Sequence, residues 1–325
     1  MNRAFFIVGP TATGKSDLAA DVAHCLGADI VSADAFQVYR GLDLLTAKPD
    51  PATLAKAPHW LIGTTPLHEE MNAEKYRRSA LRAIGEIHSR GKLTIVVGGS
   101  GLYIKALTHG LTPLPEADPE LREKLNAMSL DELCAQLVEV DPEAARKIDM
   151  KNRRRVIRAL EICLATGKPA SVQRKQWAVA ASLCEAQRMG VTTCRRSASH
   201  SEAATGVFVF RDREELYERI NHRVEAMFEK GVIEEVRAAG ATSATASQMI
   251  GLREIRRLLE GKMSLPQCIA EIQQATRRYA KRQLTWFRRQ ITFEPLNLSL
   301  FSHNEAVKWI SLRAQPRTLS GHRDD

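Results

Sequence analysis

A glycine-rich loop close to the N-terminus restricts the fold of this chain more than any other feature. The apolar run 4–8 leads directly into GPTATGKS, which matches the spacing G-x-x-x-x-G-K-[ST]. Such a loop, between a strand and a helix, turns its backbone N–H groups inward around phosphate oxygens. The predicted diphosphate- or nucleotide-binding residues are Gly9, Pro10, Thr11, Ala12, Thr13, Gly14, Lys15 and Ser16, with Lys15 as a point charge and Ser16 as a Mg²⁺ ligand.

The first 110 residues alternate between expected strands and expected helices. Strands are predicted at 3–8, 28–33 and 92–99, and amphipathic helices at 15–26 and 73–90. The segment 92–99 contains an apolar run typical of a strand that is buried on both faces of a parallel sheet. We therefore expect an α/β fold, with a P-loop NTPase-like parallel sheet flanked by helices.

Proline-rich sequence interrupts this pattern at 111–120, and the following residues to about 180 have only helical periodicity. Residues 181–205 lack periodicity and are expected to form a mobile loop, before an apolar strand resumes at 207–210. The predicted organisation is a discontinuous P-loop core, 1–112 and 203–312, that contains a mainly helical insertion domain, 113–202. The polar tail 313–325 is expected to be disordered.

A carboxylate and a second glycine-rich turn are predicted beside the phosphate loop. The strand 93–97 ends in Gly-Gly-Ser-Gly, without the acidic residue that positions Mg²⁺ in most P-loop NTPases. Asp34 instead ends the preceding strand, at the sheet edge where ligands bind in open α/β folds. Asp34 could be a general base beside the phosphates, a helix cap or a Mg²⁺ ligand.

Two helices carry cations at helical spacing. Arg219 and Arg223 share one face of the helix expected from 213, as a clamp for a phosphate group or as a solvated face. In the helix 271–290, a stripe of Ile272, Ala275, Tyr279, Gln283 and Trp286 lies opposite an arc of Arg277, Arg278, Lys281, Arg282, Arg288 and Arg289. Together with a net charge of +9, this arc favours a nucleic-acid partner.

Cysteine spacing and hydropathy exclude several classes of protein. None of the six cysteines forms a C-x-x-C pair or a zinc-ligand spacing, so we expect reduced thiols in a cytoplasmic protein. No apolar stretch approaches the roughly 18 residues that span a bilayer, and no membrane partner is expected. The N-terminal apolar run is shorter than the core of a secretory signal.

Taken in order, the motifs GPTATGKS, SADAFQVYRGLDLLTAKP, VVGGSGLY, LTPLPEADPELR, RRVIRALE, LYERINHRVEAM, IGLRE and AKRQLTWFR closely resemble the bacterial tRNA dimethylallyltransferases. The resemblance implies transfer of a dimethylallyl group from dimethylallyl diphosphate to the exocyclic amine (N6) of the adenine 3′-adjacent to the anticodon. It further implies pyrophosphate release, Mg²⁺ as cofactor, tRNA as partner and, by expectation, a monomer. An extruded purine would reach the crevice, as in other base-modifying enzymes.

The resemblance also implies residue roles. Asp34 matches the family's general base and Arg223 its pyrophosphate-binding arginine. For this reaction Gly14, Lys15 and Ser16, with Mg²⁺, would stabilise the leaving pyrophosphate, and Lys15 is the third expected catalytic residue. The residues that match tRNA-contacting positions are Asp34, Ala35, Phe36, Gln37, Ser100, Arg122, Arg154, Arg155, Val156, Ile157, Arg158, Gln248, Met249, Ile250, Gly251, Leu252, Arg253, Lys281, Arg282, Gln283, Leu284, Thr285, Trp286, Phe287 and Arg288. Ala35, Ser100 and Arg154 stand where serine, threonine and glutamine are usual.

Three alternatives stay open from the sequence. A P-loop kinase for a small metabolite or nucleotide would explain the phosphate loop but not the basic helix 271–290. An adenylate isopentenyltransferase would act on free AMP and would not need extended basic helices. A non-catalytic tRNA-binding protein would have no use for Asp34 beside a phosphate loop.

Overall fold

The computed structural model describes residues 4–111, 115, 118–173, 205–290 and 293–315. Clustering divides the chain into two compact units, residues 1–108 with 199–325 and residues 109–198. The predicted mobile loop 181–205 lies almost wholly outside the described residues. No helix within the described ranges is long and apolar enough to cross a membrane.

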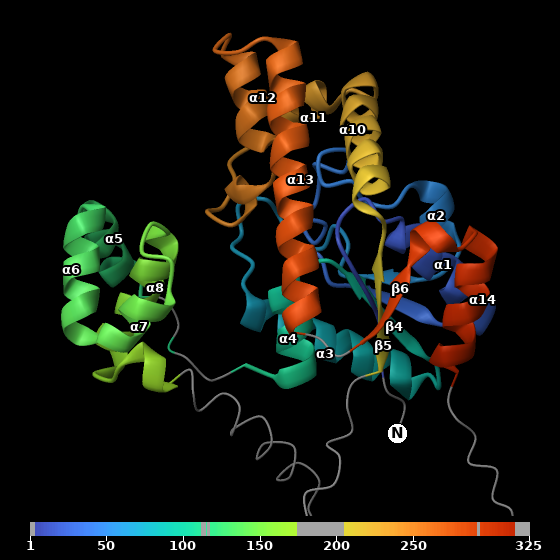
Figure 1. The fold of residues 1–325 in the computed structure, drawn as a ribbon, viewed down its shortest axis with the longest axis horizontal. Coiled ribbons are helices and arrows are strands. Elements are labelled where there is room, and N and C mark those ends of the chain that lie inside the picture. The colour runs from blue at the N-terminus through green and yellow to red at the C-terminus, as the bar shows by residue number, and fades with distance from the viewer. Residues whose placement is uncertain (1–3, 112–114, 116–117, 174–204, 291–292, 316–325) are drawn as a thin grey trace, which may run out of the picture. The chain divides into compact units, whose positions relative to one another are not determined.

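Unit 1 is built on a six-stranded sheet in the order β3-β2-β4-β1-β5-β6, and every neighbouring pair is parallel (Figure 1). The strands are β1 (Phe5–Val8), β2 (Asp29–Ser32), β3 (His59–Trp60), β4 (Thr94–Gly98), β5 (Gly206–Phe210) and β6 (Glu294–Asn297). This arrangement confirms the predicted parallel α/β sheet. The sequence analysis missed β3 and β6, the two edge strands, because β3 has only two residues and β6 contains a proline.

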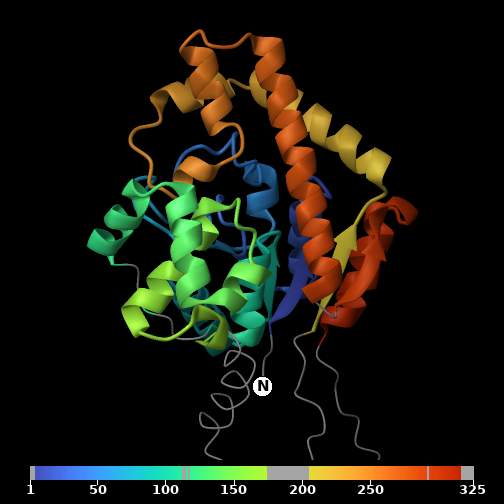
Figure 2. The ribbon, with the colours of Figure 1, turned by 60° about the vertical axis from the view of Figure 1, so that its left-hand side comes forward.

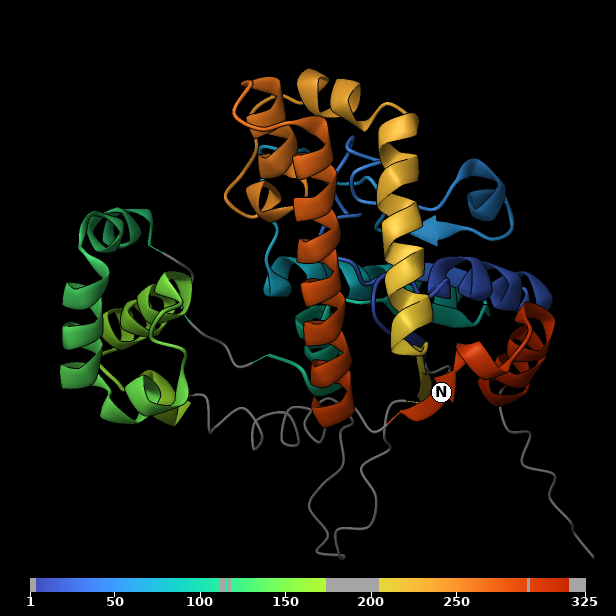
Figure 3. The same ribbon diagram turned by 45° about the horizontal axis from the view of Figure 1, so that its top comes forward.

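Alternate residues of each strand supply two separate cores. Phe5 and Ile7 pack with α1 (Lys15–Leu26) and α14 (His303–Ala314), which lie side by side in Figures 1 and 3. Phe6 and Val8 belong to the opposite core, with α3 (Ala73–Ser89) and α4 (Gly101–His109). The sheet is therefore covered on both faces, as its continuously buried strands require. Since α14 reaches Ala314, the predicted disordered tail begins too early, and its residues 316–325 lie outside the described part.

Further helices of unit 1 extend from the sheet. They are α2 (Pro51–Ala55), α10 (Arg213–Glu229), α11 (Val232–Ala238), α12 (Leu252–Leu259) and α13 (Leu265–Gln290), with short 3₁₀ turns at Ala246–Gln248 and Leu298–Leu300. α12 lies beside α13 in Figures 1 and 2. α10 lies along the other side of α13 (Figures 1 and 3). Ile220 of α10 and Ala280 of α13 are both fully buried in one apolar cluster. The long basic helix is therefore anchored from two sides.

Unit 2 is helical in its described elements: α5 (Pro119–Ala127), α6 (Leu130–Val140), α7 (Pro142–Lys147) and α8 (Arg153–Thr166). Asp118 and Asp141 cap α5 and α7, each followed by a proline in the first turn, and Ser129 forms a capping box with Glu132. These local signals set the helix starts, and α6 and α8 then bury a leucine-rich core of their own.

Candidate active site

The loops that follow β1, β2 and β4 are joined at one edge of the sheet. The Gly9 N–H donates to the Gly98 carbonyl at 3.2 Å, and the Ala33 N–H donates to the Val97 carbonyl at 2.7 Å. The Ser100 N–H in turn donates to the Ala33 carbonyl at 3.2 Å. Because parallel strands end together, the three loops predicted from the sequence form one crevice.

The phosphate loop folds around its own carbonyls. The Thr13 hydroxyl and the Lys15 Nζ both donate to the Pro10 carbonyl, at 3.0 and 3.3 Å. Burial lowers the pKa of Lys15 from 10.5 to about 8, the nearby Asp34 carboxylate opposes this, and Arg223 adds to the lowering. The charged form of Lys15 is therefore disfavoured in the free protein, and a bound anion would stabilise it.

Three arginines face this loop from β5 and α10. Arg211 donates from Nε to the Thr13 carbonyl, and Arg219 donates from Nε to the Ala12 carbonyl, each at 2.9 Å. The Arg223 Nε is buried and has no hydrogen-bond partner within the described residues. Burial also lowers the pKa of Arg223. A half-buried guanidinium with a buried, unsatisfied Nε–H donor is suited to an anionic ligand.

These contacts revise the predicted arginine clamp. Arg219 holds the backbone of the phosphate loop, and Arg223 alone of the predicted pair has its Nε unpartnered. The sequence analysis did not single out Arg211, although its place directly after the apolar run 207–210 is a usable signal, because strand ends line the crevice.

Asp34 lies half-buried at the end of β2. Its Oδ1 accepts hydrogen bonds from the Phe36 and Gln37 N–H groups, at 2.9 and 3.2 Å. The residues that follow form a turn rather than a helix, so the alternative that Asp34 caps a helix is wrong. Burial raises the pKa of the Tyr103 and Tyr279 phenols, and the Asp34 charge adds to this effect. Asp34 is thus held by its own turn, close to both cations and phenols.

Backbone contacts brace the segment after Asp34. The Ser100 Oγ accepts from the Ala35 N–H at 2.8 Å, and the Gln37 side chain donates to the Ala47 carbonyl at 2.8 Å. Lys15, Ser16, Asp34 and Gln37 line one small cavity. This cavity combines a cation, a hydroxyl and a carboxylate within the crevice.

The chain matches the model of the IPP transferase family over residues 37–290. The protein belongs to this family. The tRNA dimethylallyltransferase of Akkermansia muciniphila is 42% identical over 88% of this chain and 90% of its own length. The tRNA dimethylallyltransferase 1 of Citrifermentans bemidjiense is 44% identical over 86% of this chain and 87% of its own length.

A solved structure supports the same relationship. The tRNA isopentenylpyrophosphate transferase of Bacillus halodurans is 32% identical, with a TM-score of 0.64, covering 96% of this chain and 95% of that one. The fold of this IPP transferase family member is therefore P-loop NTPase-like, as the sequence predicts.

Only part of the 281–288 segment, which resembles a tRNA-contacting segment of the family, is available to a ligand. Lys281, Arg282, Thr285 and Arg288 are exposed. In contrast, Gln283 and Phe287 are buried, and Leu284 and Trp286 are half-buried and pack against the core. The arc predicted on this helix also loses a member, because Arg277 donates to the Asn221 side chain of α10 at 2.6 Å.

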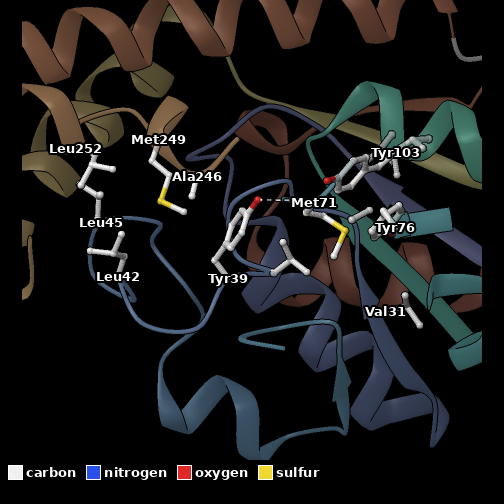
Figure 4. Close-up of a cluster of buried hydrophobic side chains, with 14 of the residues drawn as sticks. Val31, Tyr39, Leu42, Leu45, Met71, Tyr76, Tyr103, Ala246, Met249 and Leu252 are labelled. Atoms are coloured by element: carbon white, nitrogen blue, oxygen red, sulfur yellow. Dashed lines mark hydrogen bonds between the residues drawn. The ribbon is translucent and has the colours of Figure 1, made fainter. Parts of the chain in front are cut away.

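The segment 248–253 divides in the same way. Gln248 and Arg253 are exposed and Ile250 is half-buried, whereas Met249, Gly251 and Leu252 are buried. Figure 4 shows Met249 and Leu252 in the cluster with Leu42 and Leu45 of the loop that follows Asp34, next to the Tyr39 hydroxyl that accepts from the Met71 N–H. The buried members of this segment thus pack against the loop that follows Asp34. Because they are buried, they cannot contact tRNA directly in this structure.

The residues of unit 2 that resemble tRNA contacts show the same division. Arg154 and Arg155 are exposed, but Val156 and Ile157 belong to the helical core. Arg122 and Arg158 both pair with Glu161, which is only 2% exposed, at 2.5 and 3.1 Å. These two arginines therefore hold α5 and the 115 region to α8.

Proposed function

We propose that this protein transfers a dimethylallyl group from dimethylallyl diphosphate to N6 of the adenine 3′-adjacent to the anticodon of tRNA, with release of pyrophosphate. One observation carries the proposal: at a phosphate loop, a half-buried lysine and a half-buried arginine, whose buried Nε is unsatisfied, lie within electrostatic reach of a carboxylate. The relatives at 42% and 44% identity are tRNA dimethylallyltransferases, which supports the same reaction.

The cations suit the departure of the diphosphate. Breaking the allylic C–O bond places negative charge on the pyrophosphate oxygens, and Lys15 and Arg223 would stabilise that charge. Arg211 and Arg219 keep the loop in shape by binding its carbonyls. The two roles are thus divided among four cationic side chains.

A hydroxyl and a carboxylate are oxygen ligands of the kind that Mg²⁺ prefers, and Ser16 and Asp34 line the same cavity. The residues therefore fit a magnesium ion, with Ser16 as the residue that would hold it. A bound Mg²⁺ would supply further positive charge to the leaving diphosphate. Within the described residues, no cluster of three or more His, Cys, Asp or Glu side chains offers another metal site.

Asp34 suits the role of general base. As the adenine amine forms its bond to the allylic carbon, one amine proton must leave, and the Asp34 carboxylate would take it. Its Oδ1 is oriented by two backbone N–H groups, which hold the side chain in the crevice. The adenine must leave its base stack to reach Asp34.

Exposed cations would bind the tRNA backbone. Lys281, Arg282 and Arg288 on α13, Arg253 at the start of α12, and Arg154 and Arg155 in unit 2 are the exposed candidates. We also propose that the protein acts as a monomer in the cytoplasm. The six cysteines, which have no paired spacing, accord with that compartment.

The test is a transfer assay with radiolabelled dimethylallyl diphosphate, Mg²⁺ and unmodified tRNA, run in parallel with AMP as acceptor. Label in the tRNA fraction, on the adenine next to the anticodon, supports the proposal. Label on AMP alone would identify an adenylate isopentenyltransferase. ATP turnover without tRNA and without label transfer would identify a kinase or ATPase.

A further inference from the structure

The buried amide of Gln283 joins two loops of the candidate active site. Its Oε1 accepts a hydrogen bond from the Thr11 N–H in the phosphate loop at 2.9 Å. Its Nε2 donates to the Gly99 carbonyl, in the turn after β4, at 2.8 Å. An amide side chain offers an acceptor and a donor on two neighbouring atoms, as this arrangement requires. Gln283 therefore bridges segments that are far apart in the sequence.

Glycines allow α13 to approach closely enough for this bridge. A Cβ atom at Gly99 would lie 2.4 Å from the Gln283 Nε2, and one at Gly101 would lie 2.6 Å from the Trp286 ring. Tyr279, one helical turn before Gln283, lies next to the Gln283 and Ser100 side chains, both of which act on the pKa of its phenol. This face of α13 is thus fitted against the turn that carries Ser100.

Gln283 differs from its neighbours along α13 in its exposure to solvent. Gln283 is 6% exposed, whereas Lys281 and Arg282 are exposed to solvent. Both polar ends of the Gln283 side chain are already occupied by backbone groups of the two loops. Burial, together with these two bonds to backbone groups, disfavours the direct contact with tRNA that the resemblance implied for this residue.

We propose that Gln283 is a positioning residue, whose amide holds the phosphate loop in register with the Gly99–Ser100 turn so that diphosphate and Asp34 face each other. The inference rests on the proposed function. Without the bridge, the Thr11 N–H and the buried Gly99 carbonyl would lose their partner, and the phosphate loop would no longer be held to the turn after β4. Binding of the diphosphate substrate would then weaken, while binding of tRNA would not change.

The experiment compares Gln283→Met and Gln283→Glu with wild type in steady-state kinetics, varying each substrate in turn. Methionine keeps the length but makes neither hydrogen bond, and a glutamate carboxylate keeps only the acceptor. For Gln283→Met we expect about a tenfold or greater rise in KM for dimethylallyl diphosphate, with a lower kcat and an unchanged Kd for tRNA. Arg282→Ala is the matched control, because it should raise the Kd for tRNA and leave the diphosphate KM unchanged.

Three results would overturn the inference. An unchanged diphosphate KM in both Gln283 variants would show that the bridge does not position the loop. A tRNA defect like that of Arg282→Ala would show that Gln283 is a tRNA contact. A lower kcat with both KM values unchanged would show loss of folded protein only, which thermal melting of each variant would verify.

Two further measurements test the bridge independently of the folding of the Gln283 variants and of the transfer reaction. Gly99→Ala disturbs the same bridge from the opposite side, so it should also raise the diphosphate KM; an unchanged value would count against the bridge. Calorimetric binding of pyrophosphate with Mg²⁺ should weaken about tenfold or more in Gln283→Met even if wild type transfers nothing to tRNA. Wild-type inactivity would overturn the proposed function, and unchanged pyrophosphate binding would overturn the role of Gln283.

Discussion

The Ser100 Oγ accepts a hydrogen bond of 2.8 Å from the Ala35 N–H, so the turn after β4 holds the backbone directly beside Asp34. Ser100 itself is only 8% exposed and lies next to Tyr279 of α13. A residue that resembles a tRNA contact of the family therefore also supports the proposed general base from inside the protein. This relationship leads to the first prediction.

Replacing Ser100 by alanine should lower kcat about three- to tenfold, because one buried hydrogen bond contributes about 1 kcal/mol to holding the Ala35 backbone. Ser100→Thr keeps the hydroxyl and should stay within about twofold of wild type. Single-turnover transfer rates with saturating substrates would measure both variants. Equal losses in the two variants would argue against a role for the hydroxyl.

Asp34→Asn should remove most of the activity while leaving both substrates bound. The amide oxygen can still accept from the Phe36 and Gln37 N–H groups, so the turn should keep its shape. Loss of a general base typically costs about 10²–10⁴ in rate. We expect that loss in kcat, with unchanged thermal stability and unchanged Kd for tRNA. A variant that turns over at the wild-type rate would show that another group takes the proton.

Binding of diphosphate should take up a proton near pH 8. In the free protein the pKa of Lys15 is lowered to about 8, chiefly by burial, and a bound pyrophosphate anion would raise it again. Affinity for pyrophosphate should therefore fall as pH rises above about 8, by up to tenfold per pH unit. Calorimetry in two buffers of different ionisation enthalpy, at about pH 8.5, would measure the uptake. Lys15→Met should abolish it, and an equal uptake in this variant would assign the proton elsewhere.

The same lysine predicts the sign of a stability change. Between about 8 and 10.5 the unfolded chain still holds the Lys15 proton, whereas the folded chain has released it. The free energy of unfolding contributed by this group should therefore rise with pH through that range. Comparison of denaturant midpoints of wild type and Lys15→Met across the range isolates the contribution. A difference that stays constant with pH would contradict the lowered pKa.

Salt should weaken tRNA binding much more than diphosphate binding. If about five backbone phosphates are neutralised by the exposed cations, log K against log salt should have a slope near −4, because each contact releases condensed counterions. The double variant Lys281→Ala with Arg282→Ala should flatten that slope by about 1–2 and leave the diphosphate dependence unchanged. Filter binding between about 50 and 200 mM salt is sufficient to measure it. A slope near zero would mean that these side chains form only a solvated face.

The sequence by itself determined the features that are encoded locally. The phosphate loop, α1 and Asp34 could be placed because a strand, a glycine-rich turn and a helix follow one another within a few residues, and parallel strands end at a common edge. The helical periodicity of 271–290 likewise separated a buried stripe from a charged arc, apart from Arg277. Local order and periodicity are properties of neighbouring residues, so they can be recognised without the fold.

Only the tertiary structure decided which residues of a motif are buried supports and which are exposed to a ligand. Met249 and Leu252 are buried between exposed Gln248 and Arg253, and Gln283 bonds to loops near residues 11 and 99. Arg211 and Arg219 reach phosphate-loop carbonyls about 200 residues earlier in the chain, at sequence separations of 198 and 207. Edge strands β3 and β6 form only where neighbouring strands offer free hydrogen-bonding groups. The physical reason is the same in each case: burial and hydrogen-bond partners depend on which distant segments come together, and residue type and local spacing do not specify that.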